Sequence, residues 1–193
     1  MSLADRLRDA LSSAPAEAPL QGDHPELRAN ANSPAAVLIA VTNRDEPGVI
    51  LTVRREHLRT HAGQIAFPGG RVEPGETPPE AALREAHEEI LLDPGAVEVV
   101  GALEPHRTVT GYVITAVIGV IPPDLPLQPH EDEVADWFEA PLDHLVDPAN
   151  QLRRSALFEG RERHYYEIVW NGRRIWGATA AMIVNLSRRL GSW

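Results

Sequence analysis

The sequence predicts a mixed α/β protein of one domain, either an α+β fold or a three-layer α/β/α sandwich. Three observations support this prediction. The 193 residues match the usual length of one domain, and 43% of them are hydrophobic, which is enough for one core. Apolar runs of strand length recur along the chain. Segments with helical spacing of apolar residues precede and follow these runs.

The N-terminal part is predicted to be an extension, residues 1–33, ahead of a main domain at 34–193. Its residues 3–11 have apolar positions at helical spacing, and a Pro/Ala-rich stretch then continues as a loop. Charged residues alternate with leucine and alanine here, so we expect no secretory signal. No apolar run approaches the roughly 20 residues of a membrane span. We therefore expect a cytoplasmic location and no membrane partner.

The strands are predicted from short apolar or alternating runs. Two runs that flank a turn at 43–48 are expected to pair as a hairpin. A second hairpin is expected around Asn171-Gly172, because this dipeptide favours a two-residue turn. The expected strands are 35–42, 49–54, 96–103, 112–121, 133–140, 164–170 and 173–176. A turn or short helix at 141–147 and an amphipathic helix at 177–190 complete the expected elements.

A helix is also expected from residue 77 to residue 91, after a long loop rich in glycine and proline at 58–76. Thr77 is a candidate N-cap, and Pro78 suits the first turn. Glu80 completes a capping box with Thr77.

Three carboxylates share one face of this helix. Glu85, Glu88 and Glu89 fall at positions i, i+3 and i+4. Like charges at this spacing are unfavourable unless a cation binds them, and Mg²⁺ or Mn²⁺ prefers oxygen ligands of this kind. The alternative is an ordinary solvated surface of the helix.

Arg84 lies one residue out of phase with the carboxylates. It could reach Glu80 or Glu76 and hold the preceding loop against the helix. The glycines of that loop would let the backbone approach a metal closely, and a carbonyl there is a candidate ligand.

Composition excludes several classes of protein. The chain has no cysteine, which excludes disulfides, thiolate nucleophiles and cysteine-bound metals. All 18 basic residues are arginine, so no lysine can form a Schiff base. The formal charge of −10 argues against a general nucleic-acid partner.

The segment at 70–92 resembles the Nudix hydrolase box. Gly70, five residues, Glu76, seven residues, Arg84-Glu85-Ala86, one residue and Glu88-Glu89 match its spacing. The resemblance implies an α/β/α sandwich around a mixed sheet. It also implies hydrolysis of a nucleoside diphosphate linked to another moiety, with Mg²⁺ or Mn²⁺ and water.

The resemblance implies roles for individual residues. Glu85, Glu88 and Glu89 would be metal ligands and possible proton acceptors, and the Gly69 carbonyl would complete the site. Arg84 and Glu76 would form a pair that orients loop and helix.

Leu91 departs from the family pattern, which has a glycine there as a left-handed cap. Leucine pays a steric penalty in that conformation. We expect the helix to end differently, nearer Gly95, and activity to survive.

The segment at 50–70 resembles the coenzyme A pyrophosphatase branch of the family. Its Thr-x-Arg, Leu-Arg-x-His-x-Gly-Gln and Ala-Phe-Pro-Gly-Gly pieces match, and later pieces at 112–122, 133–142 and 175–183 are also similar. The resemblance implies cleavage of the small molecule CoA to 3′,5′-ADP and 4′-phosphopantetheine. The alternatives are ADP-ribose, a dinucleotide or a nucleoside triphosphate as substrate, or a non-catalytic nucleotide sensor.

Basic and polar residues of this segment are candidates for the substrate pocket. Arginine forks suit the phosphates of CoA. The candidates are Arg54, Arg59, His61 and Gln64, with Arg55 beside them. Alternatively, some of these pair with the acidic loop at 73–76 or cap the hairpin. The oligomeric state is not predicted.

Further residues have two open interpretations. Glu133 is either an additional metal-binding or base residue or a surface acid. His87 is expected to face solvent. A loop that holds His106, Arg107 and Thr108 could border the pocket. Trp137, Phe138, Trp170 and Trp176 are expected in the core rather than as a platform for a ligand, and Tyr112 could be either.

Overall fold

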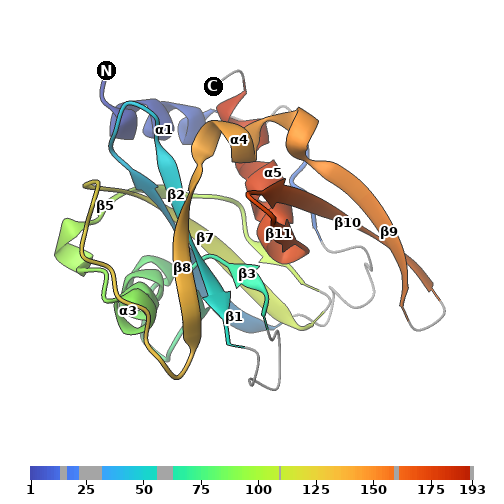
Figure 1. The fold of residues 1–193 in the computed structure, drawn as a ribbon, viewed down its shortest axis with the longest axis horizontal. Helices are drawn as coiled ribbons and strands as arrows, with labels where there is room; N and C mark the ends of the chain where they lie inside the picture. Colours follow the sequence, from blue (N-terminus) through green and yellow to red (C-terminus); the bar gives the residue numbers. More distant parts are fainter. Residues whose placement is uncertain (14–16, 22–31, 56–62, 109, 159–160, 192–193) are drawn as a thin grey trace.

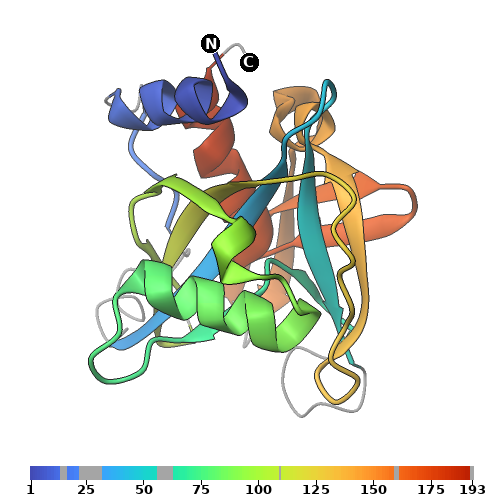
Figure 2. The same cartoon turned by 90° about the vertical axis from the view of Figure 1, so that its left-hand side faces the viewer.

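The computed structural model describes residues 1–13, 17–21, 32–55, 63–108, 110–158 and 161–191. Within these residues, eight strands form one mixed sheet and three strands form a smaller antiparallel sheet (Figure 1). Helices lie on both faces of the large sheet, as Figures 1 and 2 show together. The α/β/α arrangement expected from the sequence is confirmed.

The centre of the large sheet is a parallel pair, β1 (Ser33–Thr42) and β7 (Tyr112–Ile121), in register over the full length of both strands. β2 (Gly48–Arg54) pairs antiparallel with β1, and β5 (Glu98–Ala102) pairs antiparallel with β7. The predicted hairpin of β1 and β2 is therefore confirmed. With β3 (Ile65–Ala66) at one edge, the main strand order is β3-β2-β1-β7-β5.

Among the described residues, four further strands, three of them of two or three residues, belong to this sheet. β8 (Val134–Pro141) pairs with β2, and β6 (His106–Arg107) pairs with β7. β3 (Ile65–Ala66) also pairs with β2, and β4 (Gly69–Arg71) pairs with β1. β3 and β4 lie inside the segment that was predicted as a loop. The sequence does not predict them, because runs of two or three residues are too short to show a period in hydrophobicity.

One face of the large sheet is covered by α3 (Pro78–Ile90), which crosses it in Figure 2. The apolar side of α3 packs on alternate residues of the strands, in a core of buried alanine, leucine and isoleucine. These buried residues include Ala81, Ala82, Ala86 and Ile90 of α3 and Ala36, Leu38 and Ala40 of β1. The small alanines bring the helix axis close to β1.

The other face carries a larger core, which the remaining helices and the second sheet cover. The helices are α1 (Leu3–Ser12), α4 (Leu142–Val146) and α5 (Ala178–Leu190). The second sheet consists of β9 (Leu152–Phe158), β10 (Arg161–Trp170) and β11 (Arg173–Trp176). Two 3-10 helices lie at Pro94–Ala96 and Pro148–Asn150.

The predicted hairpin of β10 and β11 is confirmed. Asn171 and Gly172 both have positive φ angles, 47° and 73°, as a two-residue hairpin turn requires. The Phe138 ring stacks on the Trp170 ring at a centroid distance of 5.8 Å and joins β8 to this second sheet. Trp176 differs from the prediction of a core residue, because 36% of it is exposed.

The end of α3 also differs from the prediction. The helix ends at Ile90, and Leu91 adopts the left-handed conformation with φ 54° and ψ 29°. The expectation that the helix would end nearer Gly95 is wrong. The Leu91 N–H donates to the His87 carbonyl at 2.9 Å and the Leu92 N–H donates to the Ala86 carbonyl at 3.4 Å. These bonds close the helix end, so leucine keeps the cap conformation despite its steric cost.

Candidate metal and active site

The start of α3 is fixed by local hydrogen bonds. The Glu80 N–H donates to the Thr77 hydroxyl at 3.5 Å, and the Thr77 N–H donates to the Glu80 carboxylate at 2.7 Å. The predicted capping box is therefore present, with proline in the first turn. This start sets the rotation of the helix, which places its apolar side on β1 and leaves Glu85 and Glu89 facing β4.

Arg84 is the centre of a network of carboxylates. Its Nε donates to Glu76 at 2.7 Å, and its Nη1 donates to Glu85 and Glu88, both at 3.0 Å. Nη2 donates to the Arg71 carbonyl at 3.0 Å and to Glu76 at 3.1 Å. Of the two partners open from the sequence, Arg84 selects Glu76, and it also joins the loop, β4 and two carboxylates of the helix.

Glu89 is the most buried carboxylate of this group, with 4% of its surface exposed. The Gly69 N–H donates to it at 3.2 Å, and Arg54 Nη1 lies 3.8 Å from its Oε1. Burial is the largest influence and raises the pKa of Glu89 to about 7, although Gly69 and Arg54 both favour the charged form. Burial also raises the pKa of Glu85 above its ordinary value.

Glycines bring β4 against the helix. A Cβ on Gly70 would lie 2.4 Å from the Glu85 carboxylate, and a Cβ on Gly69 would lie 2.4 Å from the Ala36 carbonyl oxygen. A side chain at Gly69 would collide with the backbone of β1, and one at Gly70 would displace the Glu85 carboxylate. The backbone of β4 therefore lies directly beside Glu85 and Glu89.

The donor set fits a hard divalent cation. Burial raises the pKa values of Glu85 and Glu89 and so favours their neutral forms. A bound cation would stabilise the charged carboxylates and offset this cost of burial. Among the described residues, no three acidic or histidine side chains are close enough to hold a metal as they stand. Arg84 lies between Glu85 and Glu88 instead. Binding of a cation would therefore require these side chains to shift.

The candidate substrate residues are placed only in part. Arg54 lies at the end of β2, where its N–H donates to the Gln64 carbonyl at 3.0 Å. Its Nε is buried and has no hydrogen-bond partner among the described residues, and the Nε of Arg55 is in the same state. Arg59 and His61 lie outside the described residues. The structure thus brings the Arg54 side chain beside Glu89 and pairs the backbone of Gln64 with that of Arg54.

Glu133 is exposed, but it lies in the loop between β7 and β8, which is hydrogen-bonded to the end of α3. The His130 N–H donates to the Glu89 carbonyl at 2.8 Å, and the Arg55 N–H donates to the Glu133 carbonyl at 3.1 Å. The charge of Glu133 is among the influences that raise the pKa values of Glu85 and Glu89. Glu133 is therefore an exposed acid whose charge acts on the site, and a role as an additional metal-binding or base residue stays a prediction.

His106 and Arg107 were expected in a loop but form strand β6, which pairs with β7, and both His106 and Thr108 are buried. His87 faces solvent as predicted, and its Nδ1 lies 3.2 Å from the Leu92 carbonyl. Sequence reasoning missed Arg71, which directly follows the two glycines of the site and contacts Tyr112. Its place next to Gly70 was the available signal.

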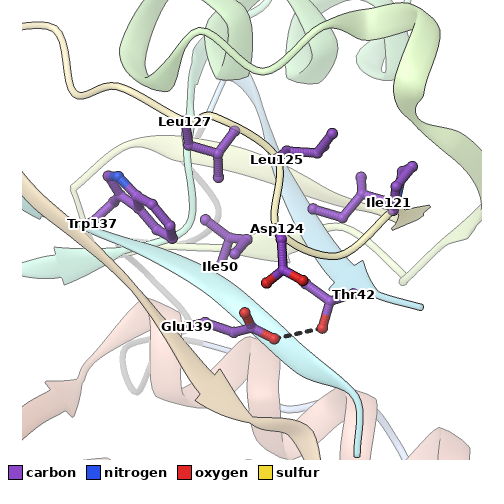
Figure 3. A pocket seen from close by; sticks show the side chains of 9 residues that line it. Thr42, Ile50, Ile121, Asp124, Leu125, Leu127, Trp137 and Glu139 are labelled. Carbon is purple, nitrogen blue, oxygen red and sulfur yellow. Dashed lines mark hydrogen bonds between the residues drawn. The ribbon is translucent and has the colours of Figure 1, made fainter. Parts of the chain in front are cut away.

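A small pocket of about 50 Å³ lies between the end of β1, strands β2 and β8, and the loop after β7 (Figure 3). Its lining includes Leu125, Trp137 and Glu139, and the Thr42 hydroxyl donates to Glu139 at 2.6 Å. No residue of the carboxylate network lines it. Thr42 is the last residue of β1, whereas the glycines of β4 pair with the first half of β1. The pocket and the carboxylate network therefore lie toward opposite ends of this strand.

The sequence model of the protein family described as the NUDIX domain matches residues 32–159 of this chain. The chain belongs to the Nudix family. A protein named "Uncharacterized Nudix hydrolase NudL" from Escherichia coli O6:H1 is 45% identical over 159 residues, which cover 81% of this chain and 82% of that protein. The protein of the same name from Shigella boydii serotype 4 is also 45% identical over the same coverage.

Solved structures agree with this assignment. The Nudix hydrolase RenU from M. smegmatis has a TM-score of 0.52 and 26% identity, over 60% of this chain and 74% of its own. A C. elegans Ap4A hydrolase in a binary complex has a TM-score of 0.50 and 19% identity, over 61% and 86%, and so supports the fold alone. This Nudix protein is a pyrophosphohydrolase that acts on a small-molecule nucleoside diphosphate derivative. Nudix hydrolases generally use divalent metals such as Mg²⁺ or Mn²⁺. Within the described part of the chain, no helix is long and apolar enough to cross a membrane.

Proposed function

We propose that this Nudix hydrolase cleaves the diphosphate of coenzyme A and its derivatives, giving 3′,5′-ADP and 4′-phosphopantetheine or its acyl form. The main support is the segment at 50–70, which resembles the coenzyme A branch and ends beside the carboxylates. Arg54 of this segment lies 3.8 Å from Glu89, and Gly69 donates a hydrogen bond to the same residue.

The charges of CoA suit this part of the molecule. CoA carries a diphosphate and a 3′-phosphate, which need local cations on a protein of net charge −10. Arg54 and Arg55 each have a buried Nε without a partner among the described residues, so each retains donor capacity. We assign both to the diphosphate, with Gln64 beside them and with Arg59 and His61 as further candidates.

We assign the metal ligands to Glu85, Glu88 and Glu89, with the Gly69 carbonyl as a fourth donor. Mg²⁺ or Mn²⁺ bound there would neutralise diphosphate oxygens and lower the pKa of a bound water. Arg84 belongs to α3 and donates to the Arg71 carbonyl of β4 and to Glu76 of the intervening loop, so it fixes the relative positions of β4 and α3.

The residues of the chain then have separate tasks. One of the carboxylates Glu85, Glu88 and Glu89 takes the proton of the attacking water. The water oxygen forms the new bond to phosphorus as the bridging P–O bond of the diphosphate breaks. The arginines stabilise the negative charge that develops on the leaving phosphate. Glu76 holds Arg84 in place through two hydrogen bonds.

A substrate panel tests the proposal. The wild-type protein is assayed with Mg²⁺ or Mn²⁺ on CoA, oxidised and acyl-CoA, ADP-ribose, NADH, diadenosine polyphosphates and nucleoside triphosphates, with products identified by mass. CoA or one of its derivatives should have the highest kcat/KM and should give 3′,5′-ADP. A higher kcat/KM for another substrate would retain the Nudix reaction and reject the CoA assignment. Binding of a nucleotide without turnover of any substrate would favour the sensor alternative.

A further inference from the structure

Arg71 lies next to the site but on the other face of the sheet. In the pairing of β4 with β1, Gly70 lies opposite Ala36 and Arg71 lies opposite Ala35. Successive side chains of a strand alternate between faces. Because Gly70 faces Glu85 and α3, Arg71 projects from the opposite face. Its carbonyl nevertheless accepts a hydrogen bond from Arg84, so its backbone is tied to the carboxylate network.

The guanidinium of Arg71 is held by Tyr112, at the start of β7. Arg71 Nη2 donates to the Tyr112 hydroxyl at 3.2 Å, and the guanidinium carbon lies 5.8 Å from the centre of the Tyr112 ring. The hydroxyl accepts this bond and keeps its own hydrogen to donate to another group. An exposed arginine with four rotatable bonds is thereby restricted in its orientation.

Tyr112 is in turn held by a buried threonine. Thr108 is only 7% exposed. Its N–H donates to the Tyr112 carbonyl at 2.9 Å, and its hydroxyl accepts from the Tyr112 N–H at 3.0 Å. The Gly111 carbonyl, one residue earlier, accepts from the N–H of Ser33 at 3.1 Å, which fixes the same turn to β1. The orientation of Arg71 therefore depends on a chain of contacts from Thr108 through Tyr112.

No carboxylate neutralises Arg71 among the described residues, although the protein is acidic. Many other arginines pair with Asp or Glu within 4 Å. These are Arg8, Arg44, Arg84, Arg154, Arg173, Arg174, Arg188 and Arg189. An oriented arginine without a carboxylate, beside a centre for diphosphate chemistry, is a binding point for an anion.

We propose that Arg71, oriented by Tyr112, binds an anionic group of the substrate that lies beyond the diphosphate. This inference rests on the proposed function, and in CoA the group is the 3′-phosphate. The diphosphate would lie at Glu85 and Glu89, on the α3 side of the sheet. Arg71 is two residues farther along β4 than Gly69, roughly 7 Å, and its side chain projects from the face opposite α3, so it meets a different group. The fork of the guanidinium and the free hydrogen of Tyr112 match the oxygens of a phosphate monoester.

The test compares CoA with 3′-dephospho-CoA. The wild-type protein should have the higher kcat/KM for CoA. Arg71→Met should reduce the ratio of the two kcat/KM values by about ten- to hundredfold, mainly through KM for CoA. Tyr112→Phe should reduce the ratio less, because the ring remains while the hydroxyl is lost. Arg8→Met, which removes one positive charge from α1, is the matched control and should leave the ratio at the wild-type value.

The two substrates separate a specific effect from a structural one. Turnover of dephospho-CoA at the wild-type rate by Arg71→Met would show that the variant folds and that its metal centre works. An equal loss on both substrates, or an unchanged ratio, would overturn the assignment of Arg71. Failure of the wild-type protein to cleave CoA would reject the proposed function itself, before any variant is compared, and the inference with it.

Discussion

Glu89 combines a buried position with a charge that the proposed chemistry requires. Burial raises its pKa to about 7, against the opposing effects of the Gly69 N–H and Arg54. Near neutral pH, the metal-free protein is therefore divided between protonated and charged forms of this residue. Because a metal ligand must be deprotonated, protons and a divalent cation compete for Glu89.

The raised pKa predicts how the stability of the metal-free protein depends on pH. The folded state holds the Glu89 proton up to about pH 7, whereas the unfolded chain releases it near its ordinary value of about 4.3. The stabilising effect of the proton is therefore present at low pH and is lost as the pH rises through 7.

Glu89→Gln, with a neutral side chain of similar shape, should remove this dependence. The unfolding free energy of the variant minus that of the wild type should be about 2–3 kcal/mol larger at pH 8 than at pH 5. Urea unfolding in EDTA at both pH values measures the difference. The same difference at pH 5 and pH 8 would show that burial does not raise this pKa.

At the scale of single elements, α3 shows how a helix keeps its ends when one residue departs from the common pattern. The sequence allowed its start to be predicted, because Thr77 and Glu80 act on the backbone next to them. The prediction for its end was wrong, because the penalty for leucine was considered alone. The hydrogen bonds of the cap and the buried Leu92 that follows outweigh a penalty of about 1–2 kcal/mol.

Leu91→Gly should therefore stabilise the protein by up to about 1 kcal/mol. Half of Leu91 is exposed, so little packing is lost, while the strain of the left-handed conformation is relieved. Leu91→Ala is the control and should give no gain, because alanine keeps the strain. Thermal unfolding compares the three proteins, and kcat should change by less than tenfold. A loss of stability in Leu91→Gly would mean that the leucine side chain itself supports the helix end.

The elements that sequence reasoning missed are held by partners distant in the chain. β9 has exposed Leu152 and Leu157 and no clear alternation, and it is a strand because it pairs with β10 along its whole length. β6 has only two residues and exists through its pairing with β7. The longer strands were predicted because their own apolar runs reflect burial.

At the scale of the whole molecule, residues 20 and 21 of the N-terminal segment are hydrogen-bonded to the C-terminal helix α5 and to residues 105–107. Asn185 of α5 accepts from the Leu20 N–H at 2.7 Å and donates to the Leu20 carbonyl at 3.1 Å. Gln21 accepts from the Arg107 N–H at 2.6 Å and donates to the Pro105 carbonyl at 3.1 Å. Residues 20 and 21 thus connect α5 to the strand that leads to Thr108 and Tyr112.

Asn185→Ala should release this connection. It leaves the Leu20 N–H without its side-chain acceptor, while the Leu20 carbonyl keeps its contact with His106 Nδ1 at 3.0 Å. The unpaired N–H should cost about 1–3 kcal/mol of unfolding free energy. Faster hydrogen exchange should appear at residues 17–21, and chemical denaturation should measure the loss. Asn43→Ala, at an exposed asparagine, is the matched control. Equal behaviour of the two variants would mean that the segment is held by other contacts.

The candidate site was predictable only where its residues are close in the chain. The spacing of Glu85, Glu88 and Glu89 indicates a shared face because a helix relates them directly. The contact of Arg71 with Tyr112 spans 41 residues, and no local pattern encodes it. The burial that raises the pKa of Glu89 likewise depends on β4 and on the loop after β7.

The most direct test of the account is the turnover of Glu89→Gln beside that of Glu98→Gln, with CoA and Mg²⁺ or Mn²⁺. Glu98 is an exposed glutamate on β5 and provides the same chemical change away from the site. Glu89→Gln should lose at least about a hundredfold in kcat with its fold intact, because a metal ligand is lost. Glu98→Gln should keep wild-type activity. Turnover of Glu89→Gln within tenfold of the wild type would contradict the assignment of the carboxylate centre.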